Sequence, residues 1–189
     1  MIGLILTLVV VGVLVLFFVV VYNGLIAKRV ACENAWSQID VQLKRRYDLI
    51  PNLVETVKGY ASHEKNTLEA VIQARNTAIN VKAGDIANKA QAESALSGAL
   101  RQLFALSESY PDLKANQNFM QLQEEITSTE NKISFSRQHY NDATAVYNTA
   151  ISQIPANVVA SFGGFTKREF FELDAVEAVA AKSAPKVSF

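Results

Sequence analysis

Few residues in this chain could carry out acid–base, nucleophilic or metal chemistry. His63 and His139 are the only histidines, and neither has the i, i+4 partner that places two zinc ligands on one helix face. Cys32 is the single cysteine, which excludes an intramolecular disulfide and a cysteine-based zinc site. Glu124-Glu125 is interpreted as a solvated helix face, because no Glu-x-x-His motif of a di-iron bundle occurs. We therefore predict no catalytic residues, no metal site, no cofactor and no enzyme activity.

The charge balance and the glycine pattern narrow the range of partners further. Lysine plus arginine number 18 and aspartate plus glutamate number 18, so the formal net charge is zero. Such a chain produces no overall field that attracts nucleic acid. The scattered glycines form neither a phosphate-binding loop nor a nucleophile elbow. We expect neither a nucleic acid nor a small-molecule substrate as a partner.

The segment from Ile2 to Val21 is continuously apolar, without charge or proline and with Thr7 as its one polar side chain. About 20 residues at ~1.5 Å each span the ~30 Å hydrocarbon core of a bilayer, where only a helix satisfies its own backbone. A cleaved signal peptide is the alternative, but the segment exceeds the ~7–15 residues of its apolar region and lacks a basic start. We predict a transmembrane anchor over residues 1–22, with lipid contacts from Ile2, Leu6, Leu14 and Val21.

The charges beside this segment indicate its orientation. Only Met1 precedes it, whereas Lys28 and Arg29 follow within the ~15–20 residues that the positive-inside rule counts. We therefore expect a short outside N-terminus, a cytoplasmic C-terminal domain and a single pass through the membrane. Lys28 and Arg29 are the predicted contacts with the lipid surface, and membrane lipid is the first expected partner.

Apolar periodicity and turn residues predict three long helices after Val21. The first continues from the span to about Val81, with a kink at Pro51. Gly84-Asp85 combines a left-handed cap with an N-cap residue, so a second helix is expected over Ile86–Ser109. The turn at Tyr110-Pro111-Asp112 then leads into a third helix that runs to about Gln153.

The third helix has the clearest pattern in the chain. Apolar or small residues recur at steps of three and four over about five heptads, which is typical of a coiled-coil seam with left-handed supercoiling. A bulky column facing a small one allows close helix packing. The bulky column is Phe119, Ile126, Ile133, Tyr140, Tyr147 and Ile154, and the small one is Leu122, Thr129, Ser136, Ala143 and Ala150.

Three charged residues interrupt the apolar face of the first helix: Arg46, Glu64 and Arg75. In one interpretation their aliphatic stems pack against the core while their charged ends reach the solvent. In the other, a buried ion pair fixes the register between helices, which requires a carboxylate from another helix.

The tail from about residue 155 differs in composition from the helices. Phe162, Phe165, Phe170 and Phe171 cluster around Gly163-Gly164. They are expected to cover the far end of the bundle; otherwise they form an apolar patch for a protein partner or the bilayer interface. A short alanine-rich helix is predicted over Asp174–Lys182.

Together these elements predict an all-α fold. A transmembrane helix continues into an elongated antiparallel up-down bundle over residues 23–189, with three long helices and a short C-terminal helix. The second helix is shorter than its neighbours, so the apolar strip at Trp36, Ile39 and Leu43 is expected to lack a partner within the chain. We expect this strip to meet a neighbouring copy in a homo-oligomer.

Two stretches carry a family resemblance. IDVQLKRRYDLIPNLVETVKGYASHE, from Ile39 to Glu64, and YPDLKANQNFMQLQEEITSTENKISFSRQHYNDATAVYNTAISQIP, from Tyr110 to Pro155, resemble the LemA family. Ala74-Arg75 and the Phe170-Phe171-Glu172 tail resemble it too. The resemblance implies a bacterial protein with a single span in the inner membrane, a helical bundle and no established enzymatic activity. It also implies relatives among membrane-remodelling and organelle-membrane proteins, and it carries no catalytic residues onto this chain.

Two functions agree with these features. The first is a membrane-anchored helical scaffold that forms homo-oligomers and organises or remodels the membrane. The second is a membrane-tethered adaptor for a cytoplasmic or membrane protein, such as a protease or a signalling receptor, with the phenylalanine-rich tail as one binding surface.

Overall fold

The fold is taken from a computed structural model, in which residues 1–172 are described. All regular secondary structure in this range is helical, and a long apolar N-terminal helix packs against other long helices, which confirms the predicted all-α fold. The described chain divides into unit 1, residues 1–38 and 136–169, and unit 2, residues 39–135 and 170–172. The helices are α1 (Ile2–Lys58), α2 (Lys65–Asn80), α3 (Ile86–Ser107), α4 (Pro111–Lys114), α5 (Gln117–Ser152) and α6 (Ala156–Phe162).

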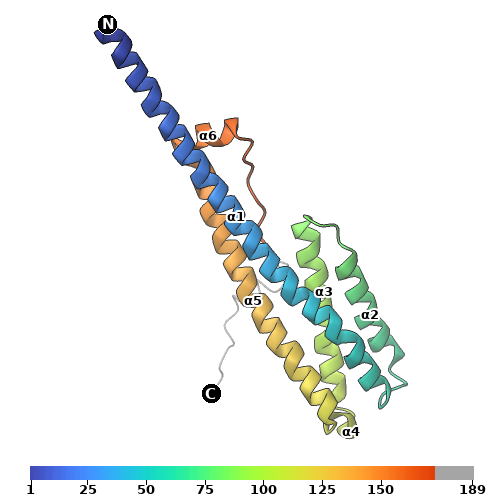
Figure 1. The fold of residues 1–189 in the computed structure, drawn as a ribbon. Helices are drawn as coiled ribbons and strands as arrows, with labels where there is room; N and C mark the ends of the chain where they lie inside the picture. The colour runs from blue at the N-terminus through green and yellow to red at the C-terminus, as the bar shows by residue number, and fades with distance from the viewer. Residues whose placement is uncertain (173–189) are drawn as a thin grey trace, which may run out of the picture. The chain divides into compact units, whose positions relative to one another are not determined.

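Helix α1 passes through the apolar segment and Pro51 without a break but ends at Lys58, so the predicted helix to Val81 is wrong. Gly59 starts a turn in which the N–H groups of Tyr60 and Ala61 donate to the carbonyl of Val57 at 3.0 and 2.8 Å. Glycine in a helix interior is about 1 kcal/mol less favourable than alanine. The turn allows α2 to fold back and pack against α3 within unit 2 (Figure 1).

The connection between α2 and α3 matches the prediction in part. Gly84 adopts a left-handed backbone conformation with φ of +88°, which glycine tolerates without steric cost. The Asp85 carboxylate accepts a hydrogen bond from the Asn88 backbone N–H at 3.2 Å and so caps α3. Asn88 also donates through its side chain to Asp85, and these two bonds lower the pKa of the Asp85 carboxyl. Asp85 therefore begins α3 as predicted, whereas α2 already ends at Asn80 with Val81 as an extended C-cap, so the helix end predicted at Gly84 is wrong.

The heptad seam predicted for the third helix is largely confirmed in α5. Its bulky column is buried from Phe119 to Tyr147. Ile154 is the exception and is 86% exposed, because α5 ends at Ser152 and Ile151 takes the buried position instead. Pro111 begins the short α4, and a hydrogen bond from the Phe119 N–H to Asn116 Oδ1 at 3.0 Å caps the start of α5.

In unit 1, α1 and α5 run antiparallel. Trp36 meets Tyr140 edge to face with ring centroids 5.2 Å apart, while further back along α1 Leu25 shares a core cluster with Ile151. The end of α5 therefore lies beside the start of the covered part of α1, and α6 follows there (Figure 1). The prediction that the tail covers the far end of the bundle is therefore wrong, because Phe165 of the tail packs with Leu25 of α1. The unpredicted turn at Gly59 reverses the chain once more, so α5 returns toward the apolar segment.

The tail after α6 is fixed along α5 by hydrogen bonds from side chains of unit 1. Tyr140 and Tyr147 donate their hydroxyls to the carbonyls of Glu169 and Thr166 at 2.9 and 3.0 Å. Asn148 donates to the Arg168 carbonyl and accepts from the Arg168 N–H, both at 2.9 Å. These contacts satisfy the polar ends of two buried tyrosines. The helix predicted over Asp174–Lys182 lies outside the described residues.

Candidate functional site: a bare apolar segment and a buried charge network

The first part of the site is the segment of α1 that the rest of the chain leaves bare. Every residue from 1 to 20 is exposed, including Ile2, Leu6 and Leu14, and the chain's own cover begins at Val21, which is half-buried. Twenty helical residues are ~30 Å long, the thickness of a bilayer's hydrocarbon core. Among the described residues, α1 is the one helix long and apolar enough to cross a membrane. The length and composition are those of a single membrane anchor.

A small core lies where the bare segment ends. Leu25 and Cys32 of α1 pack with Tyr147 and Ile151 of α5, and the tail adds Phe165. Of the two predicted lipid-surface residues, Lys28 is exposed, whereas Arg29 is half-buried with its guanidinium 5.5 Å from the centre of the Phe165 ring. Arg29 therefore also joins the tail to α1 through a cation–π contact, a role that the charge pattern did not predict.

The apolar strip expected to meet a neighbouring copy is not left uncovered. Ile39 and Leu43 are fully buried in unit 2, and Trp36 is half-buried in unit 1 against Tyr140. The prediction that these residues lack a partner within the chain was wrong. It assumed three helices of unequal length, whereas the turn at Gly59 supplies α2 as an additional element of unit 2.

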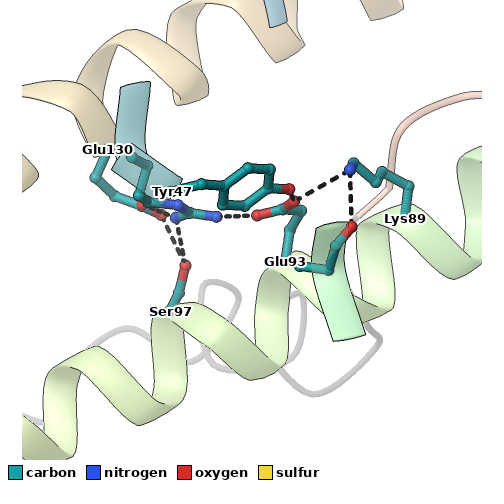
Figure 2. A network of polar contacts seen from close by, with 7 residues as sticks. Tyr47, Lys89, Glu93, Ser97 and Glu130 are labelled. Atoms are coloured by element: carbon teal, nitrogen blue, oxygen red, sulfur yellow. Dashed lines mark hydrogen bonds and ion pairs between the residues drawn. The ribbon is translucent and has the colours of Figure 1, made fainter. Parts of the chain in front are cut away.

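The second part of the site is a charge network inside unit 2, centred on Arg46 (Figure 2). Arg46 lies on α1, is only 1% exposed, and donates to Glu93 of α3 and Glu130 of α5. Its Nη1 also donates to Ser97 Oγ at 3.0 Å, and Ser97 in turn donates to Glu130 at 3.0 Å. One guanidinium thus joins three helices, so the interpretation with a buried ion pair is the correct one for Arg46.

Glu93 is the most enclosed carboxylate of this network. It accepts from Arg46 and from the Tyr47 hydroxyl, and Lys89 Nζ lies 3.8 Å from its second oxygen. Lys89 also donates to the carbonyl of Ala78 at 2.9 Å, which links α3 to α2. Figure 2 shows the Glu93 carboxylate beside Tyr47 and Lys89. A buried carboxylate needs such partners because an isolated charge is strongly disfavoured in the protein interior.

Tyr47 and Arg75 extend the network. Burial, and next the negative charge of Glu93, raise the pKa of the Tyr47 hydroxyl well above its ordinary value. Arg75 of α2 donates its Nε to the Tyr47 carbonyl at 2.8 Å. Tyr47 is therefore held as a neutral hydrogen-bond donor, which suits a structural role and not general-base chemistry.

Sequence reasoning did not single out Glu93, although its position carried a signal. Glu93 precedes Leu96, Leu100 and Leu103 at steps of three, four and three, so it occupies the buried face of α3. An acidic residue at such a position requires a basic partner from another helix. Arg46, on the apolar face of α1, is the basic partner that Glu93 requires.

The other residues that could do chemistry are dispersed. His63 and His139 are both exposed, one in each unit. Within residues 1–172, no three histidine, cysteine, aspartate or glutamate side chains are grouped so that they could hold a metal ion.

Cys32 provides a test of the unit 1 core. Burial raises the pKa of its thiol, so less of the reactive thiolate is present at neutral pH. We expect Cys32 of the folded chain to react with a maleimide at least roughly tenfold more slowly than a cysteine on the exposed surface of the same helix. The Cys32→Ala/Ser37→Cys variant is the matched control, because Ser37 is exposed on α1. Equal rates would show that this core is open.

These features define a helical protein with one N-terminal membrane-anchor segment and a charge-braced helical domain. Residues 35–189 match the sequence model of the LemA family. The chain belongs to the LemA family.

Three relatives illustrate this similarity. The chain is 29% identical over 160 residues to Protein LemA from Metamycoplasma hominis, which covers 83% of this chain and 71% of that protein. It is 24% identical over 178 residues to the magnetosome protein MamQ of Magnetospirillum gryphiswaldense, covering 82% and 63%. It is also 24% identical over 175 residues to the magnetosome protein MamQ 2 of Paramagnetospirillum magneticum, covering 80% and 64%. The chain thus spans slightly less than two thirds of the length of these two MamQ proteins.

Proposed function

We propose that this chain is a non-enzymatic, membrane-anchored scaffold that associates with copies of itself and organises or remodels the membrane. The observation that carries the proposal is the continuity of α1. One uninterrupted helix contains the bare apolar segment and the residues from Leu25 to Trp36 that pack in unit 1. Without a flexible linker, the packed unit is fixed directly to its anchor, as a scaffold that acts on a bilayer requires.

We propose a single pass through the inner membrane of a bacterial cell, with the N-terminus outside and the C-terminal domain in the cytoplasm. Lys28 and Arg29 support this orientation, because positive residues beside a span remain preferentially in the cytoplasm. The word magnetosome in the names of two relatives is consistent with a role in organising a cellular structure.

Burial of Ile39 and Leu43 requires a different surface for self-association. Val41 and Phe135 are the two most exposed large apolar residues described in unit 2, at 63% and 73%. The ion pair between Arg46 and Glu130 sets the antiparallel register of α1 and α5 in this unit. Val41 lies five residues before Arg46 on α1, and Phe135 lies five residues after Glu130 on α5. Because the two helices are antiparallel, Val41 and Phe135 lie at the same level along the helix pair. We propose that this level contributes to the contact between copies.

The test is the size of particles of the full chain in mild detergent, observed by negative-stain imaging and light scattering. We expect regular assemblies of many copies for the unchanged chain. The Val41→Glu/Phe135→Glu variant should form mainly single copies at an unchanged melting temperature, because both positions are solvent-exposed. Ser128→Glu, at an exposed position of α5, is the control and should still assemble. Single copies of the unchanged chain would contradict the scaffold and favour an adaptor that presents unit 2 to another protein.

A further inference from the structure

Helix α6 exposes apolar side chains on one face while the opposite face is buried. Val158 and Phe162 lie four residues apart on the helix and are 55% and 81% exposed, and Ile154 in the turn before Pro155 is 86% exposed. Val159 and Ala160 belong to the core of unit 1. Val158 and Phe162, one helical turn apart, form an apolar strip on α6, and Ile154 adds exposed apolar surface in the turn before the helix.

The core contacts of α6 place this strip at a defined level of α1. Val159 and Ala160 belong to the cluster of Leu25, and half-buried Val21 and Tyr22 pack against the same cluster. These residues are the first on α1 that the chain covers, directly after the bare segment of residues 1–20. Leu25 is four residues beyond Val21, or ~6 Å along the helix. The headgroup layer of a bilayer is about that thick, so a hydrocarbon core that ends at Val21 would place α6 at the depth of the headgroups.

The charges around α6 fit an anionic lipid surface. Residues 21–33 and 153–169 contain four basic residues, Lys28, Arg29, Lys167 and Arg168, and two acidic ones, Glu33 and Glu169. Glu33 is already paired with Arg168 at 2.6 Å. Lys28 and Lys167 are exposed. This net excess of positive charge attracts an anionic leaflet near the surface.

We infer that α6, together with Ile154, is an interfacial membrane helix that forms a second contact with the bilayer. Ile154, Val158 and Phe162 insert at the boundary between headgroups and acyl chains, in the leaflet where the α1 span ends. The occupant of this face is lipid, because the face is held beside the end of the membrane segment by its own core. The inference requires the span in α1 but not self-association. Two contacts at one leaflet would restrain the tilt and rotation of unit 1.

The experiment places a single tryptophan reporter in the full chain. Trp36 is the only tryptophan, so Trp36→Phe provides a background for Phe162→Trp and, separately, Val158→Trp. Each protein is reconstituted in phosphatidylcholine–phosphatidylglycerol vesicles that carry bromine either near the headgroup or near the chain end. Leu14→Trp controls for insertion of the span. His139→Trp is the aqueous control, because His139 is exposed on α5 and lies ~18 Å of helix before Ile151.

We expect Phe162→Trp and Val158→Trp to emit at shorter wavelength than His139→Trp and to be quenched most by bromine near the headgroup. Leu14→Trp should be quenched most by bromine near the chain end. The inference is overturned if both α6 reporters emit as in water while Leu14→Trp is quenched. It is also overturned if their emission is blue-shifted without lipid quenching, which would indicate a protein or a second copy on this face. If Leu14→Trp itself escapes quenching, the span is absent and the anchored scaffold fails as well.

Discussion

Replacement of Arg46 by alanine is expected to lower the free energy of unfolding by about 3–5 kcal/mol. The change removes the cation that joins α1, α3 and α5 in unit 2 and leaves the Glu93 carboxylate buried beside the Tyr47 hydroxyl. An uncompensated buried charge is much less stable than a paired one. The total free energy of unfolding of a domain is usually ~5–15 kcal/mol. The urea concentration at the midpoint of unfolding should therefore fall by a large fraction. Urea unfolding of the full chain in detergent, followed by circular dichroism, measures the change.

The neighbouring residue supplies the matched control. Arg45 pairs with Glu125 at 3.7 Å, but its side chain is 51% exposed, so Arg45→Ala should change stability by about 0–1 kcal/mol. A second variant tests the cause: Arg46→Met/Glu93→Gln removes the Glu93 charge together with that of Arg46 and should recover part of the loss, because the most enclosed carboxylate no longer stays charged without its guanidinium. Equal effects of Arg46→Ala and Arg45→Ala would contradict the structural role of the network.

The Val10→Arg/Leu14→Arg variant is expected to lose stable membrane insertion. Both residues lie near the middle of the bare segment of α1, one helical turn apart. An arginine at the centre of a span disfavours insertion by about 2.5–3.5 kcal/mol, so the pair should oppose it by about 5–7 kcal/mol. The measurement is the fraction of the full chain that stays with the membranes of expressing cells after alkaline carbonate extraction.

The control for this variant places the same kind of change outside the bilayer. Val30→Arg lies on the exposed surface of α1 beyond Lys28 and Arg29, and it should remain in the membrane fraction. If Val10→Arg/Leu14→Arg stays in the membrane fraction as fully as Val30→Arg, the segment up to Val21 is not the anchor.

Elements with a strong local signal could be predicted from the residues alone. The apolar segment before Val21 can be recognised from its length and lack of charge alone. The start of α3 after Asp85 can be predicted because a capping side chain acts over three residues. The buried column of α5 follows from a seven-residue repeat that holds from Phe119 to Tyr147. In each case the determining interactions lie within one helix or one turn of the sequence.

Elements that depend on distant contacts were predicted incorrectly or left open. A glycine in a periodic apolar pattern is compatible with a continuous helix, so nothing local required α1 to end before Gly59. The turn forms where α2 can pack against α3. Likewise, no local pattern showed whether Arg46 reaches the solvent or meets Glu93, which is 47 residues away.

The sequence by itself determined that the chain is helical, that it carries one apolar segment of bilayer length, and which face of α5 is buried. Only the tertiary structure decided the direction of α5, the location of the tail beside Val21 and Leu25, and the pairing of Arg46. The physical reason is the range of the interactions. Helix formation and capping depend on neighbours three or four residues apart, whereas a reversal of the chain or a buried ion pair is stabilised only after distant helices have packed.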